Sequence, residues 1–318
     1  MQDPLFTFPS CFAPGERLPE DPTTAAATKS GQSIVTSIYR TKIAGHCRLI
    51  TVTWCRDVLV RGLSVSVDDE GSGSGTESCG GGGGSQLVCF KVEMRPWHFW
   101  RKHGSRRFQV EGKAVDVLWD LRSAKFSGEP EPQSGFYVAV ASDHEVVLLL
   151  GDNKKEAYRK TGCRPATIDA TLVSRKEHVF GRTRFVTRAR FQDKDRPHEI
   201  AIEYSSSSSG CSIGGNIDPE MVVKIDGSVA IHVKHLQWKF RGNECITVSR
   251  ARVEVYWDVH DWLFSPGLRH AMFIFKPIAL LSSSMPLSSS SSSSVDKHIA
   301  LMTGSSGFCL FLYAWKLD

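Results

Sequence analysis

The feature that most constrains this chain is an internal repeat. A segment that begins at His98, HFWRKHGSRRFQVEGKAVDVLWDLRSAKF, aligns without gaps with LQWKFRGNECITVSRARVEVYWDVHDWLF, which begins at Leu236, 138 residues further on. Eight positions are identical, and they include Trp100 with Trp238 and Trp119 with Trp257. Because tryptophan is rare, two tryptophan pairs in register are hard to explain by chance. The alignment predicts two copies of one structural unit.

The repeated segments have the pattern of β-strands. Short runs rich in Val, Ile, Thr and aromatic residues are separated by turn residues, which is typical of antiparallel sheets. Residues 115, 117 and 119 share one side of their strand, and residues 253, 255 and 257 repeat this pattern, which indicates one buried face. We therefore expect an all-β fold, an antiparallel β-sandwich or barrel made by internal duplication. Its expected core residues include Trp100, Trp119, Trp238 and Trp257.

The repeat also divides the chain. We expect a flexible leader at residues 1–30, a first β unit at 31–151, a short helix and connection at 152–165, and a second β unit at 166–318. Asp152 or Asn153 can cap the helix, Glu156 completes a capping box, and Gly162 ends it. Tracts rich in Gly or Ser at 68–86, 205–218 and 278–306 are expected to be flexible loops. Beyond the last of them, GFCLFLYAWKLD should return as a strand beside HAMFIFKP.

Cysteine usage and hydropathy indicate the cellular compartment of the protein. The nine cysteines form no CxxC pair and no metal-finger spacing, so we expect reduced thiols, no metal site and no cofactor. The N-terminal segment has an acid at Asp3, prolines in its apolar part and no basic start, which is unlike a secretory signal. No apolar run reaches the roughly 18 residues that a membrane-spanning helix needs. The expected location is intracellular, in the cytoplasm or nucleus, without a membrane span.

Basic residues are concentrated in the middle of the chain. The net charge is +5, yet residues 151–195 alone carry twelve Lys or Arg against six Asp or Glu. Strand alternation places Arg184, Arg188 and Arg190 on one face, and a second basic group contains Arg101, Lys102, Arg106 and Arg107. These are the candidate binding residues for RNA or anionic lipid headgroups. The alternative is a solvated face whose arginines pair with acids, since the aromatic residues of a single-strand binder are missing.

The strongest candidate for catalysis is a pair of carboxylates. Asp120 and Asp258 occupy equivalent repeat positions, and duplicated lobes pair two carboxylates in aspartic proteases. Leu121 and Val259 follow them here, in place of the Thr-Gly or Ser-Gly turn of those enzymes. We therefore expect both acids to make hydrogen bonds at strand ends. No catalytic residue is assigned.

Several motifs together resemble a known family. FKVEMRPWHFWRKHGSRRF, VDVLWDLRSAKF, SGFYVAV, KHLQWKFRGNE, VEVYWDVHDWLF and FCLFLYAWK resemble, in this order, the plant family catalogued as domain of unknown function eight-six-eight. The resemblance covers the chain from about Ser30 to Asp318. It implies plant origin and a shared fold, and it implies no activity.

Three functions follow as hypotheses. The first is a noncatalytic β module that binds a ligand or a protein partner, because no complete catalytic set of residues appears. The second is an enzyme that uses polar residues at the interface between the repeats. The third is a binder of RNA or anionic lipid through the basic strand.

Overall fold

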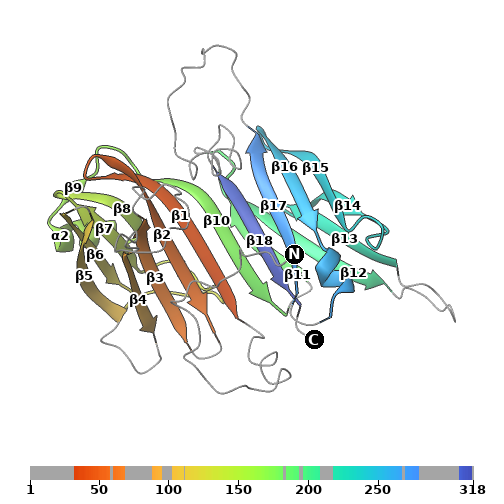
Figure 1. The fold of residues 1–318 in the computed structure, drawn as a ribbon, viewed down its shortest axis with the longest axis horizontal. Coiled ribbons are helices and arrows are strands. Elements are labelled where there is room, and N and C mark those ends of the chain that lie inside the picture. Colours follow the sequence, from red (N-terminus) through yellow and green to blue (C-terminus); the bar gives the residue numbers. More distant parts are fainter. Residues whose placement is uncertain are drawn as a thin grey trace, which may run out of the picture.

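The computed structural model of the chain is built almost entirely of β-sheet (Figure 1). It describes residues 32–57, 60–68, 88–94, 102–110, 112–181, 184–192, 196–207, 218–266, 269–278 and 308–316. These residues form three sheets, and none of the sheets closes into a barrel. The all-β prediction is therefore confirmed. The expected leader and the central parts of the three expected loops lie outside the described residues.

The largest sheet contains nine strands and runs across the whole molecule. Its order is β15 (Arg241–Val248), β16 (Ala251–Asp258), β17 (His270–Ile278), β18 (Cys309–Trp315), β10 (Thr171–Phe180), β1 (Ser33–Ile43), β2 (His46–Arg56), β3 (Arg61–Asp68) and β4 (Val88–Met94). All neighbours are antiparallel except β10 and β18. As the sequence predicted, β18 returns to pair with β17.

Two smaller sheets complete the fold. One contains β11 (Arg184–Ala189), β12 (His198–Ser207), β13 (Asp218–Ile225) and β14 (Ser228–Val233). The other contains β5 (His103–Val110), β6 (Lys113–Asp120), β7 (Tyr137–Ser142), β8 (Glu145–Gly151) and β9 (Arg164–Pro165).

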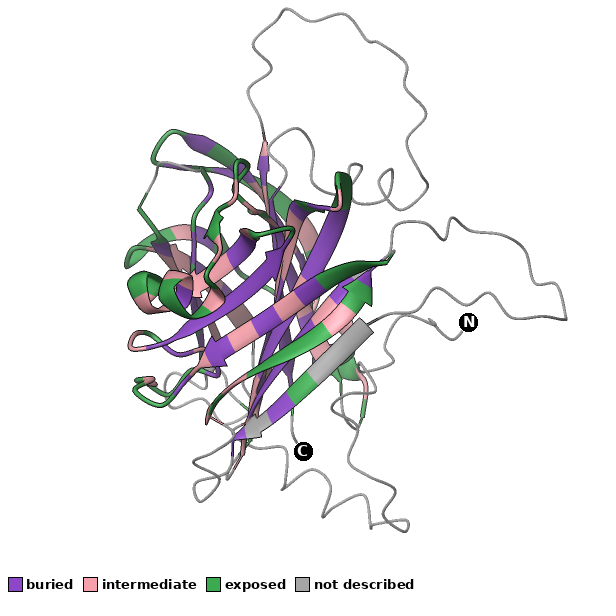
Figure 2. Cartoon of the chain, turned by 90° about the vertical axis from the view of Figure 1, so that its left-hand side faces the viewer, coloured by how far each residue is buried: buried purple, intermediate pink, exposed green. Residues whose placement is uncertain are grey.

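Both smaller sheets pack on the same face of the nine-stranded sheet. Residues paired directly across neighbouring strands lie on one face, and the pairing gives a continuous row: Leu63, Trp54, Val35, Glu177, Leu312, Phe273 and Trp257. The Trp54 end of this row belongs to the core shared with the five-stranded sheet, and the Trp257 end to the core shared with the four-stranded sheet. We call the two halves the first and the second sandwich. In the first sandwich, the alternation of buried and exposed residues is visible along the strands (Figure 2).

Strands β1 and β10 join the two sandwiches. They pair antiparallel from Ser33 opposite Val179 to Arg40 opposite Thr171. Ser37 lies opposite Arg175 near the middle of this pairing. The first strand of the first half therefore meets the first long strand of the second half edge to edge, so a single hydrogen-bonded sheet passes through both halves.

The repeated motif forms two matching hairpins. Gly104 on β5 lies opposite Trp119 on β6, and Gly242 on β15 lies opposite Trp257 on β16. Each indole covers its glycine, since an added Cβ would come within 2.8 Å of the Trp119 ring and 2.3 Å of the Trp257 ring. This contact explains why glycine and tryptophan recur together in the alignment. Both tryptophans are buried.

The other tryptophan pair does not behave as predicted. Trp238 is 80% exposed, so its assignment to the core is wrong, and Trp100 lies outside the described residues. Trp238 sits in the turn that follows β14, where its backbone N–H donates to the carbonyl of His235. The fully buried side chain of this turn is Leu236.

The helix between the halves forms where the sequence predicted, but its first turn is built differently. Helix α2 spans Lys154–Thr161 and ends at Gly162, which has left-handed backbone angles. Asn153 makes no capping bond with its side chain. Asp152 instead accepts the backbone N–H groups of Gly135 and Phe136. A second short helix, α3 (His260–Phe264), follows β16 and was not predicted.

The opposite face of the nine-stranded sheet carries an aromatic cluster on β10 and β18. The His178 ring stacks on Tyr313 with 4.6 Å between ring centroids, and the Trp315 indole N–H donates to Nδ1 of His178 over 3.1 Å. Burial, helped by His270 and Lys176, lowers the pKa of His178 to about 4. Because the Trp315 bond needs an unprotonated Nδ1, protonation of His178 opposes the folded state.

This cluster predicts a specific loss of stability in acid. The folded-state pKa of about 4 lies below the ordinary value of 6.5, so the contribution of His178 is complete above pH 6.5. It declines as the pH falls from 6.5 to 4, by up to about 3 kcal/mol in the free energy of unfolding. Urea unfolding at a series of pH values should show this decline in the wild type and a flatter profile in His178→Gln. Identical profiles for the two proteins would contradict the assignment.

Candidate binding groove between the sheets

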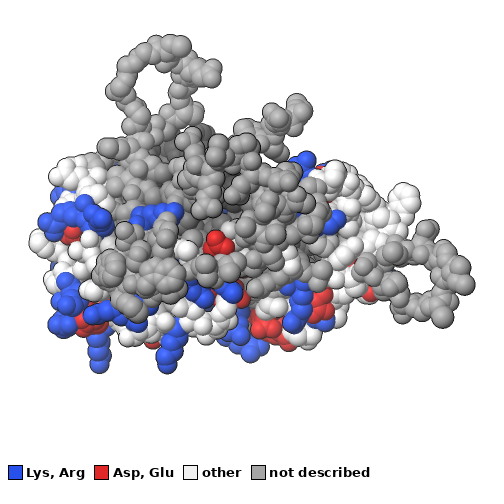
Figure 3. Space-filling view, turned by 90° about the horizontal axis from the view of Figure 1, so that it is seen from below, with Lys and Arg blue, Asp and Glu red and all other residues white. Residues whose placement is uncertain are grey.

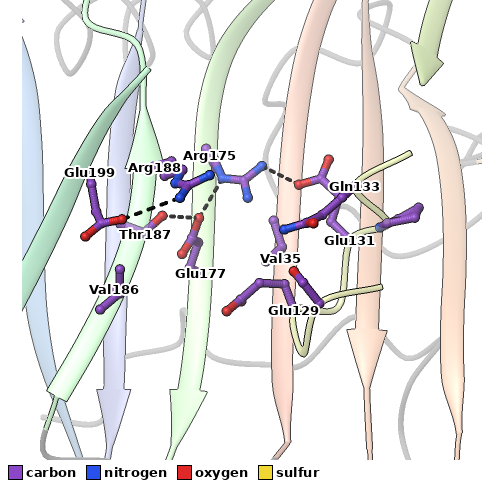
Figure 4. A pocket seen from close by; sticks show the side chains of 12 residues that line it. Val35, Glu129, Glu131, Gln133, Arg175, Glu177, Val186, Thr187, Arg188 and Glu199 are labelled. Carbon is purple, nitrogen blue, oxygen red and sulfur yellow. Dashed lines mark hydrogen bonds and ion pairs between the residues drawn. The ribbon is translucent and has the colours of Figure 1, made fainter. Parts of the chain in front are cut away.

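A groove separates the two smaller sheets on the inner face of the nine-stranded sheet (Figure 4). Its volume is about 360 Å³, which lies within the range of small-ligand pockets. Strands β1 and β10 form its floor, the loop at 127–133 forms one wall, and β11 with β12 forms the other. The lining residues are Val35, Ser127, Glu129, Glu131, Pro132, Gln133, Arg175, Glu177, Val186, Thr187, Arg188 and Glu199. We call this the inter-sheet groove.

Arg175 is the central charge of the floor. Its Nε donates to Glu177 over 2.6 Å, and one of its terminal nitrogens donates to Glu131 over 2.9 Å. Burial alone would lower the pKa of the guanidinium, but the two carboxylates outweigh burial and raise it. Arg175 therefore keeps its charge and connects β10 with the opposite wall.

Glu177 is the most enclosed charge in the groove. Its side chain is only 7% exposed, and it accepts hydrogen bonds from Arg175 and from the Thr187 hydroxyl, the latter over 2.7 Å. Thr187 belongs to β11, so this carboxylate ties the floor to the second sandwich. Nearby, burial and Glu131 raise the pKa of Tyr39 to about 12, which keeps the phenol protonated at neutral pH.

The rim of the groove is more open and is acidic. Arg188 pairs with Glu199 over 3.5 Å, and both side chains are exposed. Glu129 is exposed, and within the described residues its carboxylate has no ion-pair partner. The lining contains four carboxylates and two guanidiniums, so the groove carries an excess of negative charge.

The three predicted arginines at β11 are all exposed, and two of them pair with acids. Arg184 pairs with Glu203 over 3.0 Å and Arg188 with Glu199, while Arg190 is exposed and has no ion-pair partner among the described residues. Only Arg188 lines the inter-sheet groove. More generally, the face seen in Figure 3 carries both Lys or Arg and Asp or Glu side chains.

The second predicted basic group lies on a different sheet. Arg107 on β5 makes a two-pronged ion pair with Asp116, at 2.7 and 2.8 Å. Arg106 is exposed and Lys102 is half-buried, and Arg101 lies outside the described residues. The structure therefore does not unite the two groups into one surface.

The two equivalent aspartates act at strand ends, each within its own sandwich. Asp120 accepts the backbone N–H of Arg122, and Asp258 accepts that of His260, both over 3.1 Å. Asp120 also pairs with the Arg122 side chain, and Asp258 pairs with Arg241. Burial would raise the pKa of Asp120, but its bonds to Arg122 outweigh burial and lower it. Each carboxylate is thus bound by partners of its own sandwich, and among the described residues no hydrogen bond joins Asp120 to Asp258.

A further polar chain lies in the second sandwich. Nδ1 of His198 lies 2.7 Å from Asp226, and Nε2 lies 3.2 Å from the Ser249 hydroxyl. These residue types also occur in hydrolase triads. Here Ser249 is at the exposed turn between β15 and β16, outside the inter-sheet groove, and the chain connects that turn to the four-stranded sheet. Within the described residues, no group of three or more His, Cys, Asp or Glu side chains is arranged to hold a metal ion.

Sequence reasoning missed the central residues of the groove. Glu131 lies in a loop, and Arg175 and Glu177 follow it by more than forty positions on another element. The one available signal is TLVSRKEHVF, which places consecutive charged residues in the middle of a strand. Such charges are rarely buried unless they are paired, so a partner from elsewhere in the chain could have been expected.

The fold and the groove define an all-β class in which two sandwiches share one sheet and enclose a groove between them. Comparison with protein families matches residues 30–316 to a family described as plant protein of unknown function (DUF868). The chain belongs to this family, which confirms the resemblance of its motifs. No curated protein matches the chain. Of the helices that the structure describes, neither is long and apolar enough to cross a membrane.

Proposed function

We propose that the chain is a noncatalytic β module, built from two copies of one β unit, that binds a positively charged ligand or partner in the inter-sheet groove. The observation that carries the proposal is the groove itself, with its buried ion pairs below and its excess of carboxylates. An acidic cleft attracts cations and raises their local concentration. The arginines of the basic strand predicted an anionic partner. The excess of carboxylates in the groove instead favours a cationic partner.

The state of the ionisable groups supports binding over catalysis. General acid–base catalysis works best with a pKa near the working pH. In the groove, Arg175 is held charged and Glu177 is engaged by two donors. Near the groove, Tyr39 is held protonated. An enzyme at the interface between the repeats is thus the weaker proposal. Binding of RNA or anionic lipid is also weaker, because Arg184 and Arg188 already have acidic partners.

We place this function in the cytoplasm or the nucleus. Cys163, Cys245 and Cys309 carry free thiols. Burial raises the pKa of Cys309 to about 12, so this thiol is protonated and unreactive at neutral pH. Reduced thiols are typical of these compartments.

A charge-reversal experiment tests the proposal. A fluorescent peptide GRGRG serves as a flexible cationic probe, and its binding is measured by fluorescence anisotropy. Glu129→Lys should weaken binding by about tenfold or more, because it reverses an exposed charge at the groove. Glu244→Lys is the matched control, since Glu244 is an exposed carboxylate on β15, outside the groove. This control should bind like the wild type.

Two outcomes would overturn the proposal. One is a wild-type protein that does not bind the cationic probe even at low salt. The other is equal weakening by Glu129→Lys and Glu244→Lys, which would indicate general surface attraction. If RNA or phosphoinositide vesicles bind instead, and binding is lost when Arg184, Arg188 and Arg190 are changed to Glu, the basic strand is the binding site.

A further inference from the structure

The wall of the inter-sheet groove is the edge of a sheet. Strand β11 is the first strand of the four-stranded sheet, and in the described part of the chain β12 is its one hydrogen-bonded neighbour. Val186, Thr187 and Arg188 all line the groove, although consecutive side chains of a strand point to opposite faces. The groove therefore meets the side of the strand, where every second residue directs its backbone N–H and C=O away from β12.

The first sandwich shows what fills the equivalent position. Strand β11 follows β10 along the chain as β2 follows β1, so β11 and β2 occupy the same position in the order of their halves. There β1 pairs with β2 along its whole length, from Ser33 opposite Arg56 to Ile43 opposite His46. In the second sandwich, the strand that matches β1 is β10, and β10 pairs with β1 and β18 instead. The place beside β11 is thus without a strand in the part that the structure describes.

The surroundings of this edge suit a basic, extended chain. Glu129 and Glu131 stand on the wall opposite β11, and Glu199 lies on β12 behind it. Val186 is 39% exposed, and Val35 lies on the floor, so apolar contacts are also available (Figure 4). An unpaired strand edge is a template for another strand. Edge addition obtains affinity from main-chain hydrogen bonds and specificity from side chains at alternate positions.

We propose that the inter-sheet groove binds an extended peptide segment bearing Lys or Arg, which adds to the edge of β11 as a further strand. This rests on the proposed function and names its partner as a peptide. The backbone of the peptide pairs with β11, and its basic side chain meets the carboxylates of the groove.

The probe is a synthetic peptide with the sequence of β1, SIVTSIYRTKI, because β1 fills the equivalent edge of the first sandwich. It carries two basic residues and no acid. Two further versions of this peptide carry methyl groups on backbone nitrogens of the central residues. One version is methylated at the odd-numbered positions and the other at the even-numbered positions. In a β-strand only alternate N–H groups face a given neighbour. Strand addition therefore predicts that one methylated version loses about tenfold or more in affinity while the other binds like the parent.

Hydrogen exchange locates the binding site. Saturating peptide should slow amide exchange in β11 and leave exchange in β14, at the other end of the same sheet, unchanged. Equal effects of the two methylations, or protection elsewhere than β11, would overturn strand addition. Failure of the β1 peptide to bind also overturns it.

The outcomes separate this inference from the proposed function. If GRGRG binds and depends on Glu129, but the β1 peptide does not bind, the groove binds cations and strand addition is wrong. If the β1 peptide binds with the one-sided methylation pattern but GRGRG does not bind, strand addition is supported and the preference for positive charge is wrong.

Discussion

Replacing Arg175 with methionine should destabilise the protein by about 3–5 kcal/mol, the usual cost of removing one partner of a buried ion pair. The variant leaves Glu177, with a side chain 7% exposed, without its positive partner. It also removes the bond to Glu131 that connects β10 with the loop of the first sandwich. The free energy of unfolding in urea measures the effect.

Two variants serve as controls. Arg188→Met removes an exposed pair in the same groove and should cost about 1 kcal/mol or less. Adding Glu177→Leu to Arg175→Met removes the buried carboxylate as well and should recover much of the loss. If Arg175→Met costs no more than Arg188→Met, the ion pairs at the floor do not hold the two sandwiches together.

Replacing Trp257 with alanine should cost a similar amount, about 3–5 kcal/mol, because it empties a large volume in the core of the second sandwich. The indole covers Gly242, and its N–H donates to the carbonyl of Lys239 over 3.0 Å. Trp119→Ala should have a comparable effect in the first sandwich, since Trp119 covers Gly104 in the same way.

Trp238→Ala is the matched control. It removes the same kind of side chain from an 80% exposed position and should change stability by no more than about 0.5 kcal/mol. Thermal or urea unfolding of the three variants tests the comparison. A large loss for Trp238→Ala, or a small one for Trp257→Ala, would contradict the core described above.

Much of the fold could be predicted because patterns that are local in the sequence indicate its strands and their buried faces. The spacing of Gly104 and Trp119 recurs in Gly242 and Trp257, and in the structure these residues face each other across two hairpins. Strand alternation also identified the buried faces of β6 and β16. The error at Trp238 has the same origin, since identity at an aligned position does not report burial when that position falls in a turn.

The groove could not be predicted from local patterns. It exists because β10 pairs with β1 and β18, so that among the described residues no strand pairs with the outer edge of β11. This is a choice between partners that are distant in the sequence. Its charges come from a loop and from three strands.

The start of helix α2 could not be predicted from local patterns either. Asp152 accepts hydrogen bonds from Gly135 and Phe136, and these residues come near Asp152 only in the completed fold.

The pairing of β1 with β10 has a consequence for how a ligand can enter. Proteins with a cleft between two domains commonly close around a ligand by rotating about a flexible linker. Here a ladder of main-chain hydrogen bonds, with one irregularity between Ile38 and Tyr39, forms the floor of the cleft, so such a rotation would have to break the ladder. The two strands of the floor would therefore keep their places when the groove takes up the proposed ligand. If the proposed ligand binds here, we expect it to meet a floor that already exists, and its rate of association to depend on diffusion and charge more than on closure of the protein.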